Sequence, residues 1–389
     1  MSPDSPEPGA RPCAPDRLAP EARFLVDAMA SHFPDLGGAV TDAVEARRVL
    51  AAAPPWPFPP PPVGSVADRL VPGPPGAPEL PVRVYLPEPG TGGFPAARPT
   101  VVFFHGGGWA LCGLDTHDAI ARELCRGARA AVVSVDYRLA PEHPFPAAVD
   151  DAYAAVVWAA GHLAELGGED GALVVAGDSA GGNLATVAAL TARAAGGPDI
   201  ALQVLVYPAV DARQGAASFA TNAEGYFLTR AHCHWFRAQY LGTHASPDDP
   251  RVSPLLADLT GLPPAHIVTA GCDPLCDEGR AYAARLRGAG VRVTEGRHPG
   301  MFHGFFGFPE LLADARAAQE TVAEAIASTL DDRKNSGLEG GGDRIISRVP
   351  PCGGEPRAHT VSIREVLPWR MGHDGNSCAG TGGHSGCLP

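Results

Sequence analysis

Residues 172–190 read ALVVAGDSAGGNLATVAAL and contain the pattern that decides the fold. An apolar run typical of a buried strand leads directly into GDSAG at residues 177–181, and a helical pattern follows at once. A G-x-S-x-G turn in this context presents Ser179 at the carboxyl edge of a sheet, on a helix N-terminus. Gly177 and Gly181 have no Cβ, so the strand and the helix can approach closely. The pattern predicts a nucleophilic serine, and no Gly-Lys-Ser/Thr sequence follows to favour a phosphate-binding loop.

Strand and helix patterns alternate on both sides of this turn. Short β-rich runs predict eight strands, within residues 65–71, 82–86, 100–105, 131–137, 172–177, 202–208, 266–271 and 291–296. Helical patterns lie between them, at residues 116–129, 147–166, 182–197, 277–290 and 310–330. This alternation predicts an α/β fold with a mostly parallel central sheet flanked by helices. Residues 211–262 separate two strands by more than a simple crossover needs, and they include an aromatic helical stretch at 230–241, so we expect an inserted cap.

The ends of the chain differ in composition from the alternating region, which we place at residues 63–330. Residues 1–20 are rich in proline and are predicted to be disordered. Residues 21–62 combine apolar residues at helical spacing with a stiff proline-rich connector, so we expect them to supply cap helices. Residues 331–389 contain many glycines and no sustained periodicity, which predicts a disordered tail.

Composition and charge limit the classes of partner. The 389-residue chain has a formal net charge of −13, and nucleic acid or an anionic membrane would repel it. No stretch reaches the apolar length of a membrane span, and the N-terminus lacks the basic start and apolar run of a signal peptide. The nine cysteines have no regular spacing. We therefore expect a cytoplasmic protein with reduced thiols and a small-molecule partner, without stable membrane association; a homodimer is compatible with these features.

A second glycine-rich turn follows another predicted strand. HGGGW occupies residues 105–109, and consecutive glycines leave backbone N–H groups free to point into a cleft. An acyl-transfer enzyme needs such donors for its tetrahedral oxyanion. We assign these donors to Gly106, Gly107 and Ala180, and we expect Trp109 to form a pocket wall. His105 could be read as a base, but it lies in the wrong strand connection, so we favour a structural role in bracing the loop.

A nucleophilic serine needs a base, and the base needs an acid that orients it. Asp273 comes directly after the predicted strand at 266–271, on the same sheet edge as Ser179. Asp277 is the rival acid, but its place at a helix start is explained by capping. His303 follows the next strand and is the candidate base, with His298 as the weaker alternative.

Metal binding has little support in the sequence. The run His232-Cys233-His234 contains ligand types, but on a helix the two histidines point in different directions. Cys272 and Cys276 have a C-x₃-C spacing without a partner pair. We expect no metal. Asp178 and Glu142 could be read as an acid–base pair; we instead expect Asp178 to tighten the turn around Ser179.

Together these motifs resemble the bacterial hormone-sensitive-lipase family of esterases, in the branch with GDSAG. The motifs stand in order as HGGGW, YRLAPEHPFPAA, GDSAGGN, DPLCDEG and MFHGFF, and the resemblance covers roughly residues 20–330. It implies an α/β-hydrolase fold with a helical cap and the hydrolysis of carboxylic esters without a cofactor. It also implies that Ser179, Asp273 and His303 form the catalytic triad.

The resemblance leaves the substrate open. An amidase or arylformamidase would use the same triad, and a ligand-binding receptor on this fold would lack the histidine that this chain has at 303. Aromatic residues of the insertion are expected to roof the cleft together with Trp109 and Phe302. An apolar pocket of this kind suits short to medium acyl chains.

Overall fold

The computed structural model describes residues 18–53, 57–89, 97–166 and 172–336. Most of the two segments predicted to be disordered, 1–20 and 331–389, lies outside the described residues. At their inner boundaries the prediction is wrong by a few residues. Leu18 is buried and the Ala19 N–H donates to the Gly300 carbonyl (3.0 Å). At the other end, the last helix continues to Ser336.

One eight-stranded sheet forms the centre of the fold, in the order β1-β2-β4-β3-β5-β6-β7-β8. The pairs β1–β2 and β2–β4 are antiparallel, and all other pairs are parallel, which confirms the predicted mostly parallel sheet. The bounds are β1 Ser65–Val71, β2 Leu80–Leu86, β3 Thr100–Phe104, β4 Ala131–Val135, β5 Leu173–Asp178, β6 Leu202–Val206, β7 Ala265–Cys272 and β8 Val293–Phe302. The last strand is longer than the sequence indicated, because it continues through His298 to Phe302.

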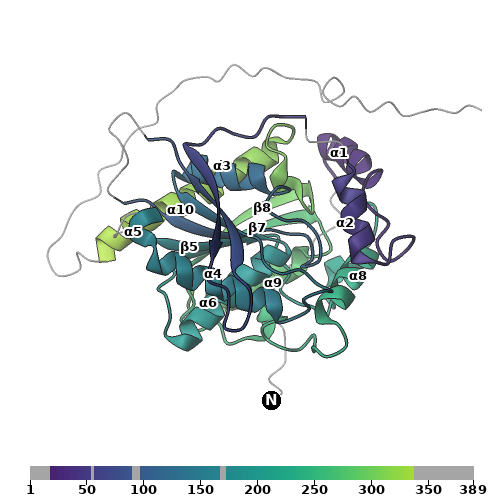
Figure 1. Cartoon of the computed structure of the whole chain (residues 1–389). Coiled ribbons are helices and arrows are strands. Elements are labelled where there is room, and N and C mark those ends of the chain that lie inside the picture. The colour runs from purple at the N-terminus through teal and green to yellow at the C-terminus, as the bar shows by residue number, and fades with distance from the viewer. Residues whose placement is uncertain (1–17, 54–56, 90–96, 167–171, 337–389) are drawn as a thin grey trace, which may run out of the picture. The chain divides into compact units, whose positions relative to one another are not determined.

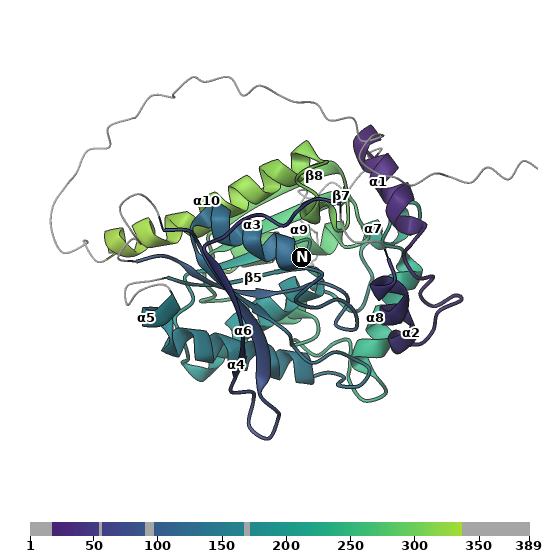
Figure 2. The ribbon, with the colours of Figure 1, turned by 45° about the horizontal axis from the view of Figure 1, so that its top comes forward.

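Helices cover both faces of the sheet (Figures 1 and 2). Helices α3 (Asp118–Ala128) and α10 (Ala313–Ser336) cover one face, and α4 (Ala147–Gly161), α6 (Ala180–Ala195) and α9 (Cys276–Gly288) cover the other. Each face buries a large apolar cluster, as strands covered on both sides require. The short α5 (Leu163–Leu166) follows α4. Within the described ranges, no helix has the length and hydropathy to cross a bilayer.

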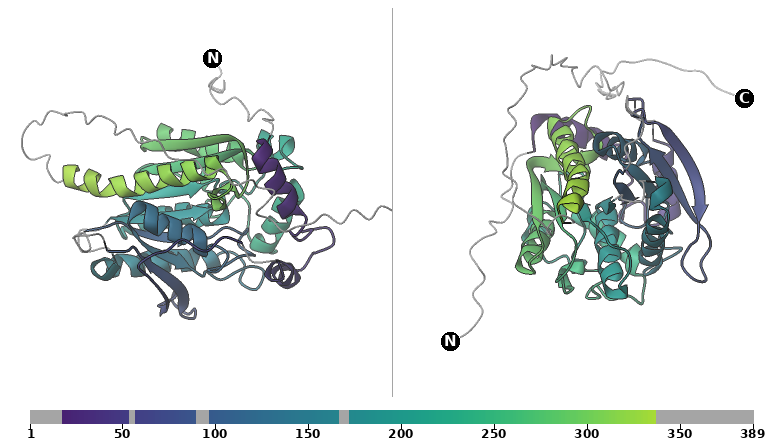
Figure 3. Two further views of the ribbon diagram at one scale, coloured as in Figure 1. Left: turned by 90° about the horizontal axis from the view of Figure 1, so that it is seen from above. Right: turned by 90° about the vertical axis from the view of Figure 1, so that its left-hand side faces the viewer.

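Four further helices gather at one end of the sheet (Figures 1 and 3). They are α1 (Pro20–Ala30), α2 (Ala43–Ala51), α7 (Ala217–Thr221) and α8 (Arg230–Leu241), and we call them the cap helices. The first two come from the N-terminal segment, and the last two lie within residues 211–262, between β6 and β7. Three of the four share a small third core that contains Leu36, Phe219 and Trp235. Short 3₁₀ turns at Pro254–Leu256 and Phe305–Gly307 complete the described elements.

The close approach of β5, α6 and β3 depends on two glycines. A methyl group on Gly177 would overlap the backbone of Gly181, and one on Gly181 would overlap the Phe104 carbonyl at the end of β3. These overlaps involve backbone atoms that cannot move aside. The expectation that Gly177 and Gly181 permit a close strand–helix approach is therefore confirmed.

We predict that Gly181→Ala lowers the free energy of unfolding by about 2 kcal/mol or more, because the added carbon must displace backbone in a packed sheet. Urea unfolding of the wild-type chain and the variant measures the difference. The matched control is Gly161→Ala at the end of α4, where a methyl group meets no atom within 4 Å. Equal stability of the two variants would contradict the proposed packing constraint.

Candidate active site

Ser179 lies in a strained turn between β5 and α6. Its backbone has φ +56° and ψ −117°, a conformation that non-glycine residues rarely adopt. Two backbone hydrogen bonds to residues at the end of β6 and just beyond it hold the turn. The Ser179 N–H donates to the Val206 carbonyl (2.9 Å), and the Ser179 carbonyl accepts from the Ala209 N–H (3.1 Å). The side chain consequently lies above the N-terminus of the 16-residue helix α6, where developing negative charge is favoured.

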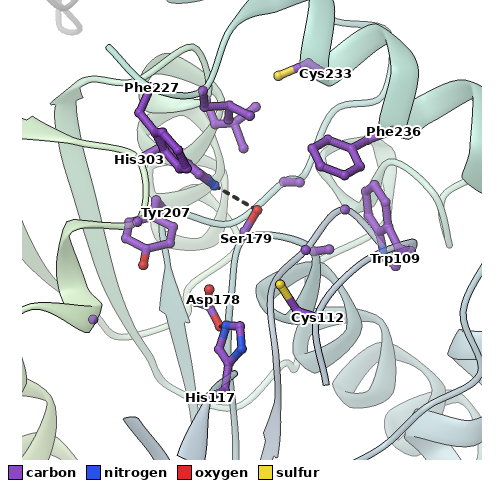
Figure 4. A pocket seen from close by; sticks show the side chains of 18 of the residues that line it. Trp109, Cys112, His117, Asp178, Ser179, Tyr207, Phe227, Cys233, Phe236 and His303 are labelled. Carbon is purple, nitrogen blue, oxygen red and sulfur yellow. Dashed lines mark hydrogen bonds and ion pairs between the residues drawn. The ribbon is translucent and has the colours of Figure 1, made fainter. Parts of the chain in front are cut away.

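A line of two hydrogen bonds connects Ser179, His303 and Asp273 (Figure 4 shows the first of them). The distance from His303 Nε2 to Ser179 Oγ is 2.9 Å, and from His303 Nδ1 to Asp273 Oδ2 it is 2.8 Å. Asp273 follows β7 and is fully buried; its other oxygen accepts from the Leu275 N–H (2.8 Å). In the tautomer whose Nδ1 proton is donated to Asp273, Nε2 is free to accept the serine proton.

The rival residues lie elsewhere. His105 is buried, stacks on Tyr137 and contacts the Gly106 carbonyl through Nδ1 (2.7 Å), and burial lowers its pKa to about 3. His298 pairs with Asp314 (2.6 Å), and Asp277 accepts from the backbone N–H of Ser218. The structure therefore brings His303 and Asp273, and none of the rivals, to Ser179.

The structure gives no support to a metal site at His232-Cys233-His234. His232 reaches back to cap its own helix, with Nδ1 accepting from the Thr229 N–H (3.4 Å). Among the residues that the structure describes, no group of three or more His, Cys, Asp or Glu side chains could hold an ion. Glu142 is paired with Arg47 of α2 (2.7 Å) and takes no part in an acid–base pair with Asp178.

One predicted oxyanion donor is wrong. The Gly106 N–H donates to Asp178 Oδ1 (2.9 Å), with a longer contact to His117 Nε2 (3.3 Å), so it is already occupied. Gly107 and Gly108, with φ +109° and +59°, line the cavity instead, together with Ala180. The free donors near Ser179 thus belong to Gly107, Gly108 and Ala180.

Asp178 explains why Gly106 is not an oxyanion donor. Its buried carboxylate needs a donor and accepts from the Gly106 N–H, and His117 Nε2 lies 3.4 Å from the same oxygen. Burial alone would raise the pKa of Asp178, but the neighbouring His117 imidazole lowers it, and the net pKa lies below the ordinary value. Asp178 therefore joins the turn around Ser179 to the glycine turn at residues 106–112. The sequence predicted only that Asp178 would tighten the turn around Ser179.

The sequence analysis missed two residues of the site, His117 and Tyr207. His117 precedes α3, and its ring is fixed by Thr116 Oγ1 at Nδ1 (2.9 Å). Tyr207 packs against the imidazole of His303, with ring centroids 4.6 Å apart (Figure 4). His117 lies at the start of a predicted helix and Tyr207 at the end of a predicted strand, and these positions were the available signal.

An apolar cavity of about 430 Å³ opens above Ser179. Its aromatic walls come from the sheet edge and from the cap: Phe33, Trp109, Phe227, Phe236, Tyr240 and Phe308. The predicted wall position of Trp109 agrees with this lining. The prediction for Phe302 is wrong: its side chain is fully buried in the core and stands behind Phe227 and Phe308. Phe302 is the last residue of β8 and packs into the core, whereas His303 begins the turn that follows and reaches Ser179.

Comparisons with known proteins agree with this geometry. A family model described as the alpha/beta hydrolase fold matches residues 101–307. The carboxylic ester hydrolase LipN of Mycobacterium tuberculosis is 47% identical over 68% of this chain and 70% of its own length. The carboxylesterase NlhH of the same species is 45% identical over 68% of this chain and 81% of its own. Among solved structures, a hyperthermophilic esterase from Pyrobaculum calidifontis is 38% identical, with a TM-score of 0.72 over 80% of this chain and 98% of that chain.

We predict that Asp178→Ala lowers kcat on an activated ester by about tenfold or more. The variant removes the shorter of the two contacts of the Gly106 N–H, and loss of a buried hydrogen-bond partner costs roughly 1–3 kcal/mol. Steady-state kinetics at saturating ester measure the effect. Asp178→Asn keeps an acceptor oxygen and should retain more activity. Wild-type kcat in a folded Asp178→Ala variant would show that this bond does not hold the glycine turn.

Proposed function

This chain belongs to the bacterial hormone-sensitive-lipase family of α/β hydrolases, and on that premise we propose that Ser179, His303 and Asp273 hydrolyse small carboxylic esters. The observation that carries the assignment is the unbroken line of hydrogen bonds from Asp273 through His303 to Ser179. It stands beside Gly107, Gly108 and Ala180, which line the same apolar cavity.

The residues act in a fixed order. His303 accepts the Ser179 proton at Nε2 as the oxygen attacks the ester carbonyl, while Asp273 holds the imidazole by its Nδ1 proton. The carbonyl oxygen gains negative charge and accepts from the N–H groups of Gly107, Gly108 and Ala180. His303 then protonates the leaving alcohol. Water, activated by the same imidazole, releases the acid from the acyl-enzyme.

The wider assignments follow from charge and composition. We propose a small-molecule ester as the partner of the chain and the cytoplasm as its location. The net charge of −13 opposes binding to nucleic acid or to anionic membranes. Binding of the purified chain to DNA or to anionic vesicles at physiological salt would contradict this proposal. A homodimer is compatible with it, and sedimentation distinguishes a dimer from a monomer.

We expect Ser179→Ala to lower ester turnover by several orders of magnitude while the melting temperature changes little, because only the nucleophilic oxygen is removed. Hydrolysis of p-nitrophenyl butyrate by the purified variant measures this loss. Residual activity close to that of the wild-type chain would remove Ser179 from the mechanism. An anilide of the same acid, run in parallel, tests the amidase alternative on the same triad.

The cavity also predicts an acyl preference. Burial of each methylene contributes about 0.8 kcal/mol, so kcat/KM should rise roughly fourfold per added carbon until the cavity is filled. We propose an optimum at about four to eight acyl carbons, an extrapolation from methylene burial and from the family. A series of p-nitrophenyl esters below their solubility limits tests it. Maximal turnover on emulsified triolein, with a jump when the oil phase appears, would favour a lipase instead.

A further inference from the structure

The glycine turn, residues 106–112, has an unusual backbone. Gly107, Gly108, Trp109 and Cys112 all have positive φ values, of +109°, +59°, +59° and +69°. For the tryptophan and the cysteine this backbone region is disfavoured. Such a conformation persists only where the surrounding structure holds it in place. The glycine turn therefore needs external support at the point where it supplies hydrogen-bond donors.

Support on the sheet side reaches Gly106 and Trp109 of the glycine turn; the Ala140 N–H, after β4, donates to the Trp109 carbonyl (2.8 Å). Asp178 and His117 hold the N–H of Gly106, as described above. Within the turn, the N–H groups of Ala110 and Leu111 bond to the Gly107 carbonyl. These contacts do not involve the Gly108 N–H, which is one of the proposed oxyanion donors.

Two aromatic side chains of the cap helix α8 meet the middle of the glycine turn. The Phe236 ring lies directly against the Cα of Gly108, so that a methyl group at Gly108 would overlap the ring. One helical turn later, Tyr240 stacks on Trp109, with centroids 4.1 Å apart and planes within 6°. Residues four apart share a helix face, so α8 presents both rings to the glycine turn together. Figure 4 shows Phe236 and Trp109 side by side at one wall of the cavity.

The end of the glycine turn belongs to the core of the cap. Ala110 and Leu111 are buried in the cluster that contains Leu36, Ala46, Trp235 and Phe236. Arg47 of α2 donates from Nε to the Ala110 carbonyl (2.8 Å) and pairs with Glu142 through both terminal nitrogens.

Helix α8 is itself tied to the N-terminal cap segment, because Trp235 Nε1 donates to the Thr41 carbonyl (3.0 Å). The glycine turn is thus contacted by two cap helices, α8 and α2.

We propose that Phe236 is a positioning residue for the hydrolysis proposed above: it fixes Gly108, and through it the N–H that stabilises the oxyanion. The inference rests on the proposed function. It gives the cap a role in the chemical step besides enclosing the substrate, because the backbone of one donor is held by a cap side chain. Docking of the cap and stabilisation of the oxyanion are then coupled.

Phe236 also lines the cavity, and this suggests a competing role as a wall alone. The two roles differ in how they depend on the acyl chain. A wall contacts the chain, so its loss should affect long acyl groups and leave an acetyl ester nearly unchanged. A positioning residue acts on the carbonyl oxygen, which every ester has, so its loss should lower kcat by a similar factor for all chain lengths.

The test compares Phe236→Ala and Phe236→Leu with the wild-type chain on p-nitrophenyl acetate and hexanoate. We expect kcat to fall by about ten- to hundredfold on both esters in the alanine variant, with KM changing less, because one oxyanion donor loses its support. The leucine variant should recover part of the loss. Inhibition by a trifluoromethyl ketone, which forms an oxyanion on Ser179, should weaken by a similar factor, whereas the corresponding methyl ketone should bind almost as before.

The control is Leu36→Ala, which removes a buried side chain of the same cap core that does not line the cavity. Melting temperatures are measured for all variants, and the leucine variant carries the test if the alanine variant does not fold. The inference is overturned if kcat on the acetate is unchanged, or if Leu36→Ala loses as much kcat as Phe236→Ala. If Ser179→Ala keeps its activity, the proposed function fails, which is a separate outcome.

Discussion

The hydrogen bond from the Gly106 N–H to the Asp178 carboxylate joins the two turns on which the site depends. Asp178 ends β5 immediately before Ser179, and Gly106 lies just beyond the end of the neighbouring strand β3. The carboxylate is buried and depends on protein donors, so the geometry of one turn restricts the other. The distance between the nucleophile and the start of the glycine turn is thereby set within the sheet edge.

Much of the site followed from the sequence because parallel topology is restrictive. The carboxyl ends of β5, β7 and β8 meet at one edge, so residues placed just after those strands had to lie near one another. Ser179, Asp273 and His303 were found by that argument. The choice among three consecutive glycines could not be made in the same way. It depends on backbone angles and on a buried carboxylate that accepts a hydrogen bond from one of the N–H groups. Neither feature can be predicted from the sequence HGGG.

The error at Phe302 has a similar origin. The strand β8 ends at Phe302, whose side chain belongs to the core, and only the turn that begins at His303 reaches the cavity. The sequence identified an aromatic residue next to the base in the chain. A shift of one residue along the chain decides whether a side chain lines the cavity or packs in the core. His117 and Tyr207 were missed because a single histidine or tyrosine near the end of a predicted element is most often structural. Only the contacts to Asp178 and His303 give these residues a function.

Backbone strain is concentrated around the cavity. In the described part of the chain, seven non-glycine residues have positive φ, and six of them line the cavity: Trp109, Cys112, Ser179, Tyr207, Gln214 and Phe227. The seventh, Arg129, ends α3 in the usual left-handed cap. Each strained residue opposes folding, so the apolar clusters on both sheet faces and in the cap must offset the strain. The cap core is the smallest of the three and also contacts the glycine turn most directly. It follows that the part of the fold with the least apolar packing holds the most strained part of the site, and that the geometry of the site is most sensitive to changes there.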